Sequence, residues 1–213
     1  MSTVLIATLG FEEKFCYRAV LRHGIKEGDR VILLTGELVE KVVKAYDWIR
    51  KLIQSSYGDS VSIELIKLNP SDPIKSVREI SKIIRGIGDS RIIVNLSGGM
   101  RAVIAYTLLS CMMNAREGMI IEMETEDLSG LITLDWKLLK LLRDGISDEL
   151  RELLKAIASG SSDVKSLSSK LGKDESTVRR QLSLLKELGL IRVVKRKPLI
   201  IEPTELAELI IEG

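Results

Sequence analysis

Short apolar segments alternate with helical patterns over the first 118 residues of this 213-residue chain, and this alternation constrains the fold most. Each apolar segment is rich in aliphatic residues and is followed by a stretch with helical periodicity. Strands that are apolar on both faces are typical of a parallel sheet covered by helices on both sides. The predicted strands are residues 4–8, 30–35, 61–68 and 91–96, and the predicted helices are residues 12–23, 38–55, 73–86 and 100–115.

The pattern changes after Gly118. Residues 119–123 and 130–134 are strand patterns joined by an acidic loop, residues 124–127, with no helix between them. Two consecutive strands of this kind predict a hairpin at the edge of the sheet. Residues 135–146 are predicted to form a short linker helix, so that the first domain spans residues 1–134.

Two loops follow the first and fourth predicted strands, Thr8-Leu9-Gly10-Phe11 and Ser97-Gly98-Gly99-Met100-Arg101. In an open parallel sheet the carboxyl ends of such strands lie at one edge, where ligands bind. A strand that runs through two glycines into a helix exposes backbone N–H groups, and the guanidinium of Arg101 adds a forked cation. This combination favours an anionic ligand. The alternative is that the glycines serve packing alone, because neither the P-loop nor the dinucleotide-binding spacing is present.

From Ser147 onward, three helical patterns precede a hairpin and a closing helix. Ser147 is the predicted N-cap of the first helix and Asp174 that of the third, because both residue types accept hydrogen bonds from the first N–H groups of a helix. This order predicts a winged helix-turn-helix domain over residues 147–213. Its other predicted elements are helices at 163–171 and 175–188, strands at 190–195 and 199–202, and a closing helix at 204–211.

Basic residues are concentrated in this second domain. Residues 161–197 hold ten basic and four acidic residues, a local charge of +6, whereas the whole chain has a net charge of +2. Such a patch is typical of duplex DNA binding, and recognition helices contact bases near their N-termini. The alternative is a winged helix that contacts proteins, with its Lys and Arg side chains merely solvated. The residues predicted to bind DNA are Lys173, Ser176, Thr177, Arg179, Arg180, Lys195, Arg196 and Lys197.

Cysteine and histidine content restricts the chemistry. Cys16 and Cys111 lie in helical patterns without a C-x-x-C pair, which predicts two small buried hydrophobes in a reducing compartment. His23 is the one histidine, so a multi-histidine metal site is excluded, and the following Gly24 predicts that it ends a helix. With no secretory signal and a longest apolar stretch of residues 102–113, the chain is predicted to be cytoplasmic, without a membrane partner, metal or catalytic residue.

Two parts of the sequence resemble known families. Residues 167–182, LSSKLGKDESTVRRQL, and residues 185–191, LKELGLI, resemble the winged-helix modules of prokaryotic transcription regulators. The loops Thr8–Phe11 and Ser97–Arg101 resemble those of CARF domains, the CRISPR-associated Rossmann-like sensors. In this order, the two parts resemble the CARF-type transcription regulators of archaeal type I CRISPR–Cas systems.

The resemblance implies a homodimer whose Rossmann-like domains bind a cyclic oligoadenylate, most often the tetra-adenylate, and whose winged helices bind double-stranded DNA. The ring is an effector, and no cofactor is implied. Two alternatives remain open: a ring nuclease that cleaves the cyclic nucleotide, against which the lack of a histidine near either loop argues, and a winged-helix regulator without a ligand. The residues predicted to form the ligand site are Thr8, Leu9, Gly10, Phe11, Asn95, Ser97, Gly98, Gly99, Met100 and Arg101.

Overall fold

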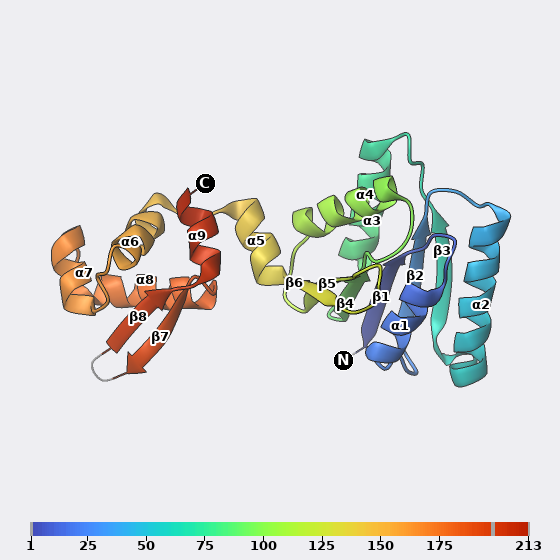
Figure 1. Cartoon of the computed structure of the whole chain (residues 1–213), viewed down its shortest axis with the longest axis horizontal. Helices are drawn as coiled ribbons and strands as arrows, with labels where there is room; N and C mark the ends of the chain where they lie inside the picture. Colours follow the sequence, from blue (N-terminus) through green and yellow to red (C-terminus); the bar gives the residue numbers. More distant parts are fainter. Residues whose placement is uncertain (1, 197–198, 213) are drawn as a thin grey trace. The chain divides into compact units, whose positions relative to one another are not determined.

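The computed structural model describes residues 2–196 and 199–212, with the backbone alone for Arg196 and Glu212. The chain divides into two compact units, Met1–Leu139 and Lys140–Gly213 (Figure 1). The division falls within helix α5 (Trp136–Asp144), which is the predicted linker helix. Trp136 and Leu139 pack against the core of the first unit, whereas Leu141 belongs to the core of the second.

The first unit is built on a six-stranded sheet with the order β3-β2-β1-β4-β5-β6. The first five strands are parallel to one another, and β6 pairs antiparallel with β5. The predicted parallel sheet with an edge hairpin is therefore confirmed. The strands are β1 (Thr3–Thr8), β2 (Arg30–Thr35), β3 (Ser62–Lys67), β4 (Arg91–Asn95), β5 (Met119–Glu124) and β6 (Leu131–Asp135).

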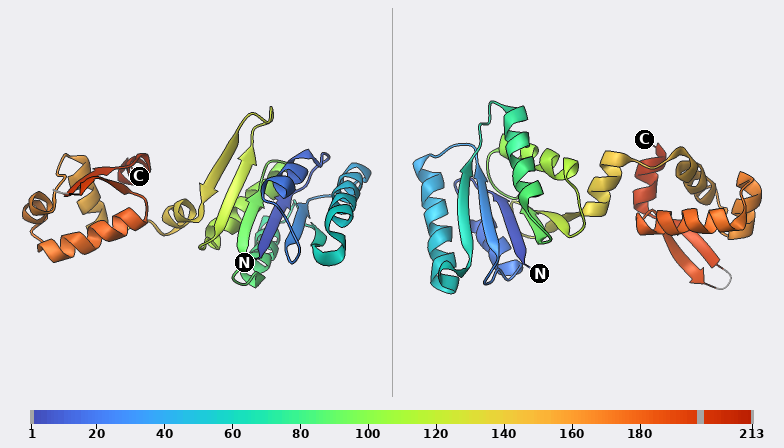
Figure 2. Two further views of the ribbon diagram at one scale, coloured as in Figure 1. Left: turned by 90° about the horizontal axis from the view of Figure 1, so that it is seen from below. Right: turned by 180° about the vertical axis from the view of Figure 1, so that it is seen from behind.

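Helices cover both faces of the sheet, which is why its strands are apolar on both sides (Figure 2). Side chains of β1 alternate between two cores: Leu5 and Ala7 pack with α1 and α2, whereas Val4 and Ile6 pack with α3 and α4. Both cysteines are buried, and burial raises the pKa of each thiol to about 12. The helices are α1 (Lys14–Arg22), α2 (Glu40–Tyr57), the single 3₁₀ turn η1 (Gly58–Ser60), α3 (Pro73–Gly86) and α4 (Arg101–Met113).

The second unit is a winged helix-turn-helix, as predicted. The hydroxyl of Ser147 and the carboxylate of Asp174 accept hydrogen bonds from Leu150 N and Thr177 N, so both predicted N-caps are confirmed. The buried face of α8 packs on a core that all three helices share. Lys197 and Pro198, at the predicted hairpin tip, lie outside the described residues. The elements are α6 (Asp148–Ala158), α7 (Val164–Leu171), α8 (Glu175–Glu187), β7 (Ile191–Arg196), β8 (Leu199–Pro203) and α9 (Glu205–Glu212).

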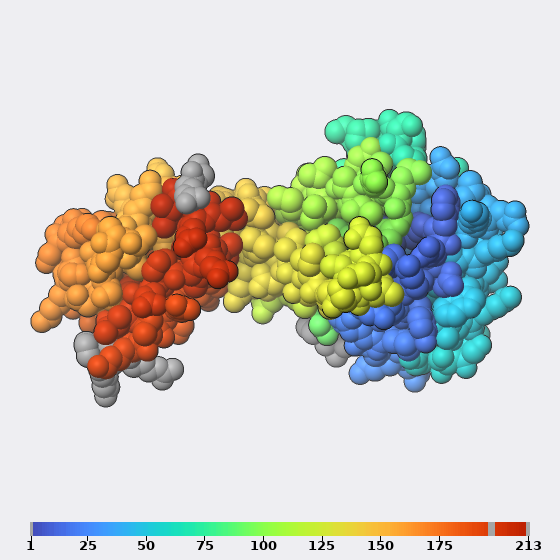
Figure 3. Space-filling view, in the orientation of Figure 1, coloured from blue at the N-terminus to red at the C-terminus, as the bar shows by residue number. Residues whose placement is uncertain are grey.

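One loop assignment was wrong. The predicted acidic loop began at Glu124, but this residue is the last of β5 and its side chain is only 1% exposed. Arg18 and Arg22 on α1 pair with its carboxylate, which makes burial of the charge possible. In the space-filling view the hairpin segment (yellow) lies beside α1 (blue) (Figure 3). No helix among the described residues is long and apolar enough to cross a membrane.

Candidate functional site

The two predicted ligand loops meet at the carboxyl edge of the sheet. β1 and β4 are neighbours, and the chain proceeds from β1 to β2 on one side and from β4 to β5 on the other. Ligands bind at such a switch point in open α/β sheets. The hydroxyl of Thr8, at the end of β1, donates a hydrogen bond to the carbonyl oxygen of Gly98, after β4.

The glycines allow the two loops to touch backbone to backbone. Gly99 has φ +101°, and a Cβ there would lie 3.2 Å from both the carbonyl carbon and the Cβ of Thr8. A Cβ on Gly10 would lie 3.0 Å from the Cα of Gly99. Packing thus accounts for the glycines themselves, which was the alternative interpretation, and the same packing fixes the loop that leads into α4.

The N-terminus of α4 is open. Its N-cap is Met100, which makes no side-chain capping bond, and the first backbone bond of the helix runs from Ile104 N to the carbonyl of Met100 at 3.0 Å. Within residues 2–196 and 199–212, the N–H groups of Gly98 through Arg101 donate to no acceptor. Such N–H groups and the helix dipole attract anions. The hydroxyl oxygen of Ser97 accepts from the Glu124 N–H at 2.8 Å, which leaves its own hydrogen to donate to a ligand.

A cavity of about 550 Å³ opens beside the loops. Phe11 and Phe15 line it together with Met100, and the loop after β2 contributes Gly36 and Glu37. The sequence prediction missed Phe15 and the β2 loop, although a glycine directly after a predicted strand is the same signal that identified the other two loops. The predicted residues that line the cavity are Leu9, Gly10, Phe11, Ser97, Gly98, Gly99 and Met100.

Three predicted ligand residues do not line this cavity. Thr8 and Asn95 are buried beneath the loops, where their side chains make hydrogen bonds within the protein. Asn95 donates to Glu122 at 2.9 Å and accepts from Ser97 N at 3.2 Å. Arg101 is exposed at the start of α4, with no ion pair within the described part of the chain.

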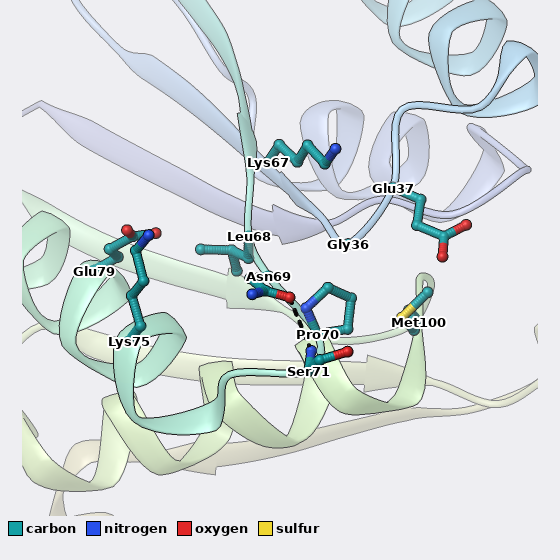
Figure 4. A pocket seen from close by; sticks show the side chains of 10 residues that line it. All are labelled: Gly36, Glu37, Lys67, Leu68, Asn69, Pro70, Ser71, Lys75, Glu79 and Met100. Carbon is teal, nitrogen blue, oxygen red and sulfur yellow. Dashed lines mark hydrogen bonds between the residues drawn. The ribbon is translucent and has the colours of Figure 1, made fainter.

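A second cavity of about 560 Å³ lies next to the first (Figure 4). Its lining includes Lys67 at the end of β3 and Lys75 in the first turn of α3. The two cavities share Gly36, Glu37 and Met100. A Cβ on Gly36 would lie 2.9 Å from the Sδ of Met100, so this methionine packs against the glycine where the cavities adjoin.

An ionic cluster lies behind the Ser97 loop, and the sequence prediction missed it. His23 ends α1, as predicted, but its Nε2 also lies 2.7 Å from Oε2 of Glu122, whose side chain is 1% exposed. Burial alone would raise the pKa of Glu122. Hydrogen bonds from His23 and Asn95 and the charge of Arg22 outweigh burial, so that this pKa lies below its ordinary value.

On α8 the predicted DNA-binding residues divide into two groups. Arg180 is exposed and unpaired among the described residues, whereas Arg179 lies 3.4 Å from Glu175. The hydroxyls of Ser176 and Thr177 donate to Asp174, and these bonds hold the pKa of Asp174 well below its usual range.

Lys173 lies away from the exposed cations. Its Nζ is buried, 3.9 Å from Oε2 of Glu149, because the acidic first turn of α6 attracts it. Lys195 on β7 is exposed, as the prediction requires. The Arg196 side chain and all of Lys197 lie outside the described residues, so their predicted roles stay predictions.

Comparisons with known proteins agree with this architecture. Residues 3–135 match the Csa3 CRISPR-associated Rossmann-like domain, and residues 150–193 match the bacterial regulatory proteins of the arsR family. Over 205 residues the chain is 26% identical to the "CRISPR locus-related putative DNA-binding protein Csa3" of Thermoproteus tenax, which covers 92% of this chain and 90% of that protein.

Solved structures show the fold at low sequence identity. Enterococcus italicus Csm6 bound to cyclic hexa-2'-fluoro-hexa-dAMP matches 88% of this chain and 52% of its own, with a TM-score of 0.51 and 14% identity. A type III CRISPR defence DNA nuclease activated by cyclic oligoadenylate matches 88% of this chain and 30% of its own, with a TM-score of 0.43 and 17% identity. The chain spans about half the length of Csm6. Because the first family model covers most of the chain, this protein belongs to the Csa3 family of CRISPR-associated proteins and carries an arsR-type regulatory winged helix.

Proposed function

We propose that this protein is a DNA-binding transcription regulator that binds a cyclic oligoadenylate, the tetra-adenylate above all, at the paired loops after β1 and β4. The observation that carries the ligand proposal is the open N-terminus of α4, with its free N–H groups from Gly98 to Arg101. The protein shares its fold with Csm6, a protein solved with a cyclic adenylate analogue, which supports the choice of ligand.

The two parts of such a ligand match two parts of the site. Phosphodiester groups are anions that backbone N–H groups, the hydroxyl of Ser97 and the guanidinium of Arg101 can bind. Nucleobases are flat and partly apolar, and Phe11 and Phe15 in the adjoining cavity offer surfaces on which a base can stack.

The proposed ligand-binding form is a homodimer, because a two-fold symmetric ring suits a site made of two copies of the same loops. Helix α4 is apolar around its whole circumference, and Leu109 on it is 50% exposed. Helices of this kind are normally buried. Analytical ultracentrifugation tests this step: Leu109→Glu should yield a monomer, whereas the same change at the exposed Leu21 of α1 should not. A monomeric parent protein would contradict the proposal.

Isothermal titration with cyclic tri-, tetra- and hexa-adenylate tests the ligand. Arg101→Ala should weaken binding by about 1.5–3 kcal/mol per site, because it removes a charge-assisted contact with a phosphate. Arg91→Ala is the matched control, since Arg91 is exposed at the opposite end of β4. Unchanged affinity for the Arg101 variant would show that the site is misplaced. Chromatography after the titration reveals cleavage products, and their presence would favour the ring-nuclease alternative.

The DNA proposal is tested with Arg180→Ala and Lys195→Ala. Loss of Arg180 should reduce discrimination between operator and random duplex by about 1–3 kcal/mol, as for a guanidinium that contacts a guanine. Loss of Lys195 should weaken both duplexes equally and make the salt dependence shallower by about 0.9 per phosphate contact. Unchanged DNA affinity in both variants would favour a winged helix that contacts proteins.

We further propose that ligand and DNA binding are coupled. Coupling of this kind is reciprocal and typically amounts to about 1–3 kcal/mol. Operator affinity should therefore change with saturating cyclic tetra-adenylate, and ligand affinity should change by the same factor with saturating operator. Equal operator affinity with and without ligand, at fixed salt and protein concentration, would contradict the coupling.

A further inference from the structure

Two carboxylates are buried at the carboxyl end of β5. The side chains of Glu122 and Glu124 are each 1% exposed. Arg22 forks across them, with Nη1 2.9 Å from Oε1 of Glu122 and Nη2 2.6 Å from Oε1 of Glu124. His23 and Arg18 bind the other two carboxylate oxygens. Every carboxylate oxygen of the pair therefore has a partner.

The same cluster holds the loop after β4. Nδ2 of Asn95 donates to Oε1 of Glu122 at 2.9 Å, and Oδ1 of Asn95 accepts from the N–H of Ser97 at 3.2 Å. The N–H of Glu124 donates to the hydroxyl oxygen of Ser97 at 2.8 Å. Both anchors meet on Ser97, the residue directly before the free N–H groups of the proposed ligand site.

Stability alone does not account for this arrangement. Burying two carboxylates costs so much desolvation energy that apolar residues of similar size often serve a fold equally well. Among the described residues of the first unit, the third buried carboxylate is Asp29, at the start of β2 on the opposite edge of the sheet. It accepts from the N–H groups of Thr3 and Lys26, at 2.7 and 2.9 Å, and so serves the local backbone.

We propose that Glu122 is a positioning residue for the ligand. It holds Asn95, and through Asn95 it fixes the direction of the N–H groups that follow Ser97. Arg22 and His23 in turn hold the carboxylate of Glu122. A loop fixed in advance does not have to be ordered on binding, and this raises affinity. The effect on ligand affinity rests on the proposed function, whereas the effect on the loop itself does not.

The test uses Glu122→Ala, Glu122→Gln and the control Asp29→Ala, at a temperature where circular dichroism shows all of them folded. Glu122→Ala should weaken cyclic tetra-adenylate binding about tenfold, which is the cost of ordering one further loop segment. Glu122→Gln should restore most of the affinity, because its amide oxygen still accepts from Asn95. Asp29→Ala should destabilise the fold but leave the affinity unchanged.

A second measurement needs no ligand. The ¹H–¹⁵N resonances of Ser97, Gly98 and Gly99 should shift in Glu122→Ala and stay in place in Asp29→Ala. If Glu122→Ala does not fold, Asn95→Ala should show the same shifts, since it removes the bridge and leaves the ion pairs intact. Unmoved loop resonances, or equal loss of affinity in the Glu122 and Asp29 variants, would overturn the inference. A parent protein that binds no cyclic oligoadenylate would refute the proposed function, and the resonances would still decide whether Glu122 positions the loop.

Discussion

The N-termini of α4 and α8 are both placed to meet phosphate groups, but they are built differently. Helix α4 begins without a side-chain cap, so its first N–H groups stay free. At α8, Asp174 accepts from Thr177 N at 2.9 Å and from two nearby hydroxyls. A capped terminus has already satisfied part of its donor capacity and carries a negative charge. Binding at α4 can therefore use the backbone, whereas binding at α8 has to use side chains, Arg180 foremost.

The two termini also differ in how they are held. The turn before α4 is fixed by close backbone contact between Gly99 and Thr8. Before α8, Gly172 also has a positive φ, +63°, but no atom lies within 4 Å of the position of its missing Cβ. The ligand site should thus respond to changes of shape and the DNA surface to changes of charge.

The largest expected effect comes from Gly99→Ala. A left-handed backbone conformation and a Cβ 3.2 Å from Thr8 should together cost about 3 kcal/mol of unfolding free energy and separate the two loops. Ligand binding should be lost with it. Gly172→Ala, strained but with open space, should cost about 1 kcal/mol. Urea denaturation measures both variants, and equal losses would show that the contact between the loops is not tight.

Met100→Asp breaks the comparison by giving α4 the cap that α8 already has. The backbone of Met100 is extended (φ −72°, ψ 132°), as an N-cap requires. The new carboxylate should stabilise the helix by about 1 kcal/mol and weaken an anionic ligand about tenfold or more, because it occupies the same N–H groups. Met100→Ala is the control, since it removes the side chain without adding a cap. Tighter ligand binding by the Asp variant would contradict an anion site.

Much of this fold could be predicted because its signals are local. The caps Ser147 and Asp174, the apolar strands and the start of α3 at Pro73 all depend on residues within a few positions of one another. Boundaries set by tertiary packing were less accurate: the helix predicted from residue 12 begins at Lys14, and the one predicted from residue 38 begins at Glu40.

The candidate site was predictable where it depends on loops at strand ends and not where it depends on distant pairs. His23 could be placed at a helix end from Gly24, but its contact with Glu122 joins positions 99 residues apart. The charge of Lys173 suggested a role in DNA binding, yet its partner Glu149 lies on another helix. Charge counts along a sequence show which side chains are cationic. They do not show which of these a neighbouring carboxylate draws inward.

Asp174→Ala sharpens the comparison from the other side. Removal of this cap should lower the unfolding free energy by about 1 kcal/mol, because Thr177 N loses its acceptor. Ser147→Ala should cost less, since its hydroxyl accepts from Leu150 N at the longer distance of 3.4 Å. Discrimination between operator and random duplex should remain in both variants, because Arg180 is unchanged. Loss of that discrimination in Asp174→Ala alone would show that the helix terminus, not the arginine, reads the DNA.

The smallest expected effect is a change in pH dependence at the cluster behind the ligand loop. The pKa of Glu122 is lower in the folded protein than its ordinary value of 4.5, because the hydrogen bonds from His23 and Asn95 and the charge of Arg22 outweigh burial. A carboxylate of this kind stabilises the fold above its unfolded pKa, and this contribution is lost as pH falls through the folded pKa. Urea denaturation from pH 7 to pH 3 should therefore show a stability difference between the parent protein and Glu122→Gln that is greatest above about pH 4.5 and shrinks on acidification. A difference that stays constant over this range would mean that the ionised carboxylate does not stabilise the cluster. The open terminus of α4 would then owe its placement to the glycine contacts alone.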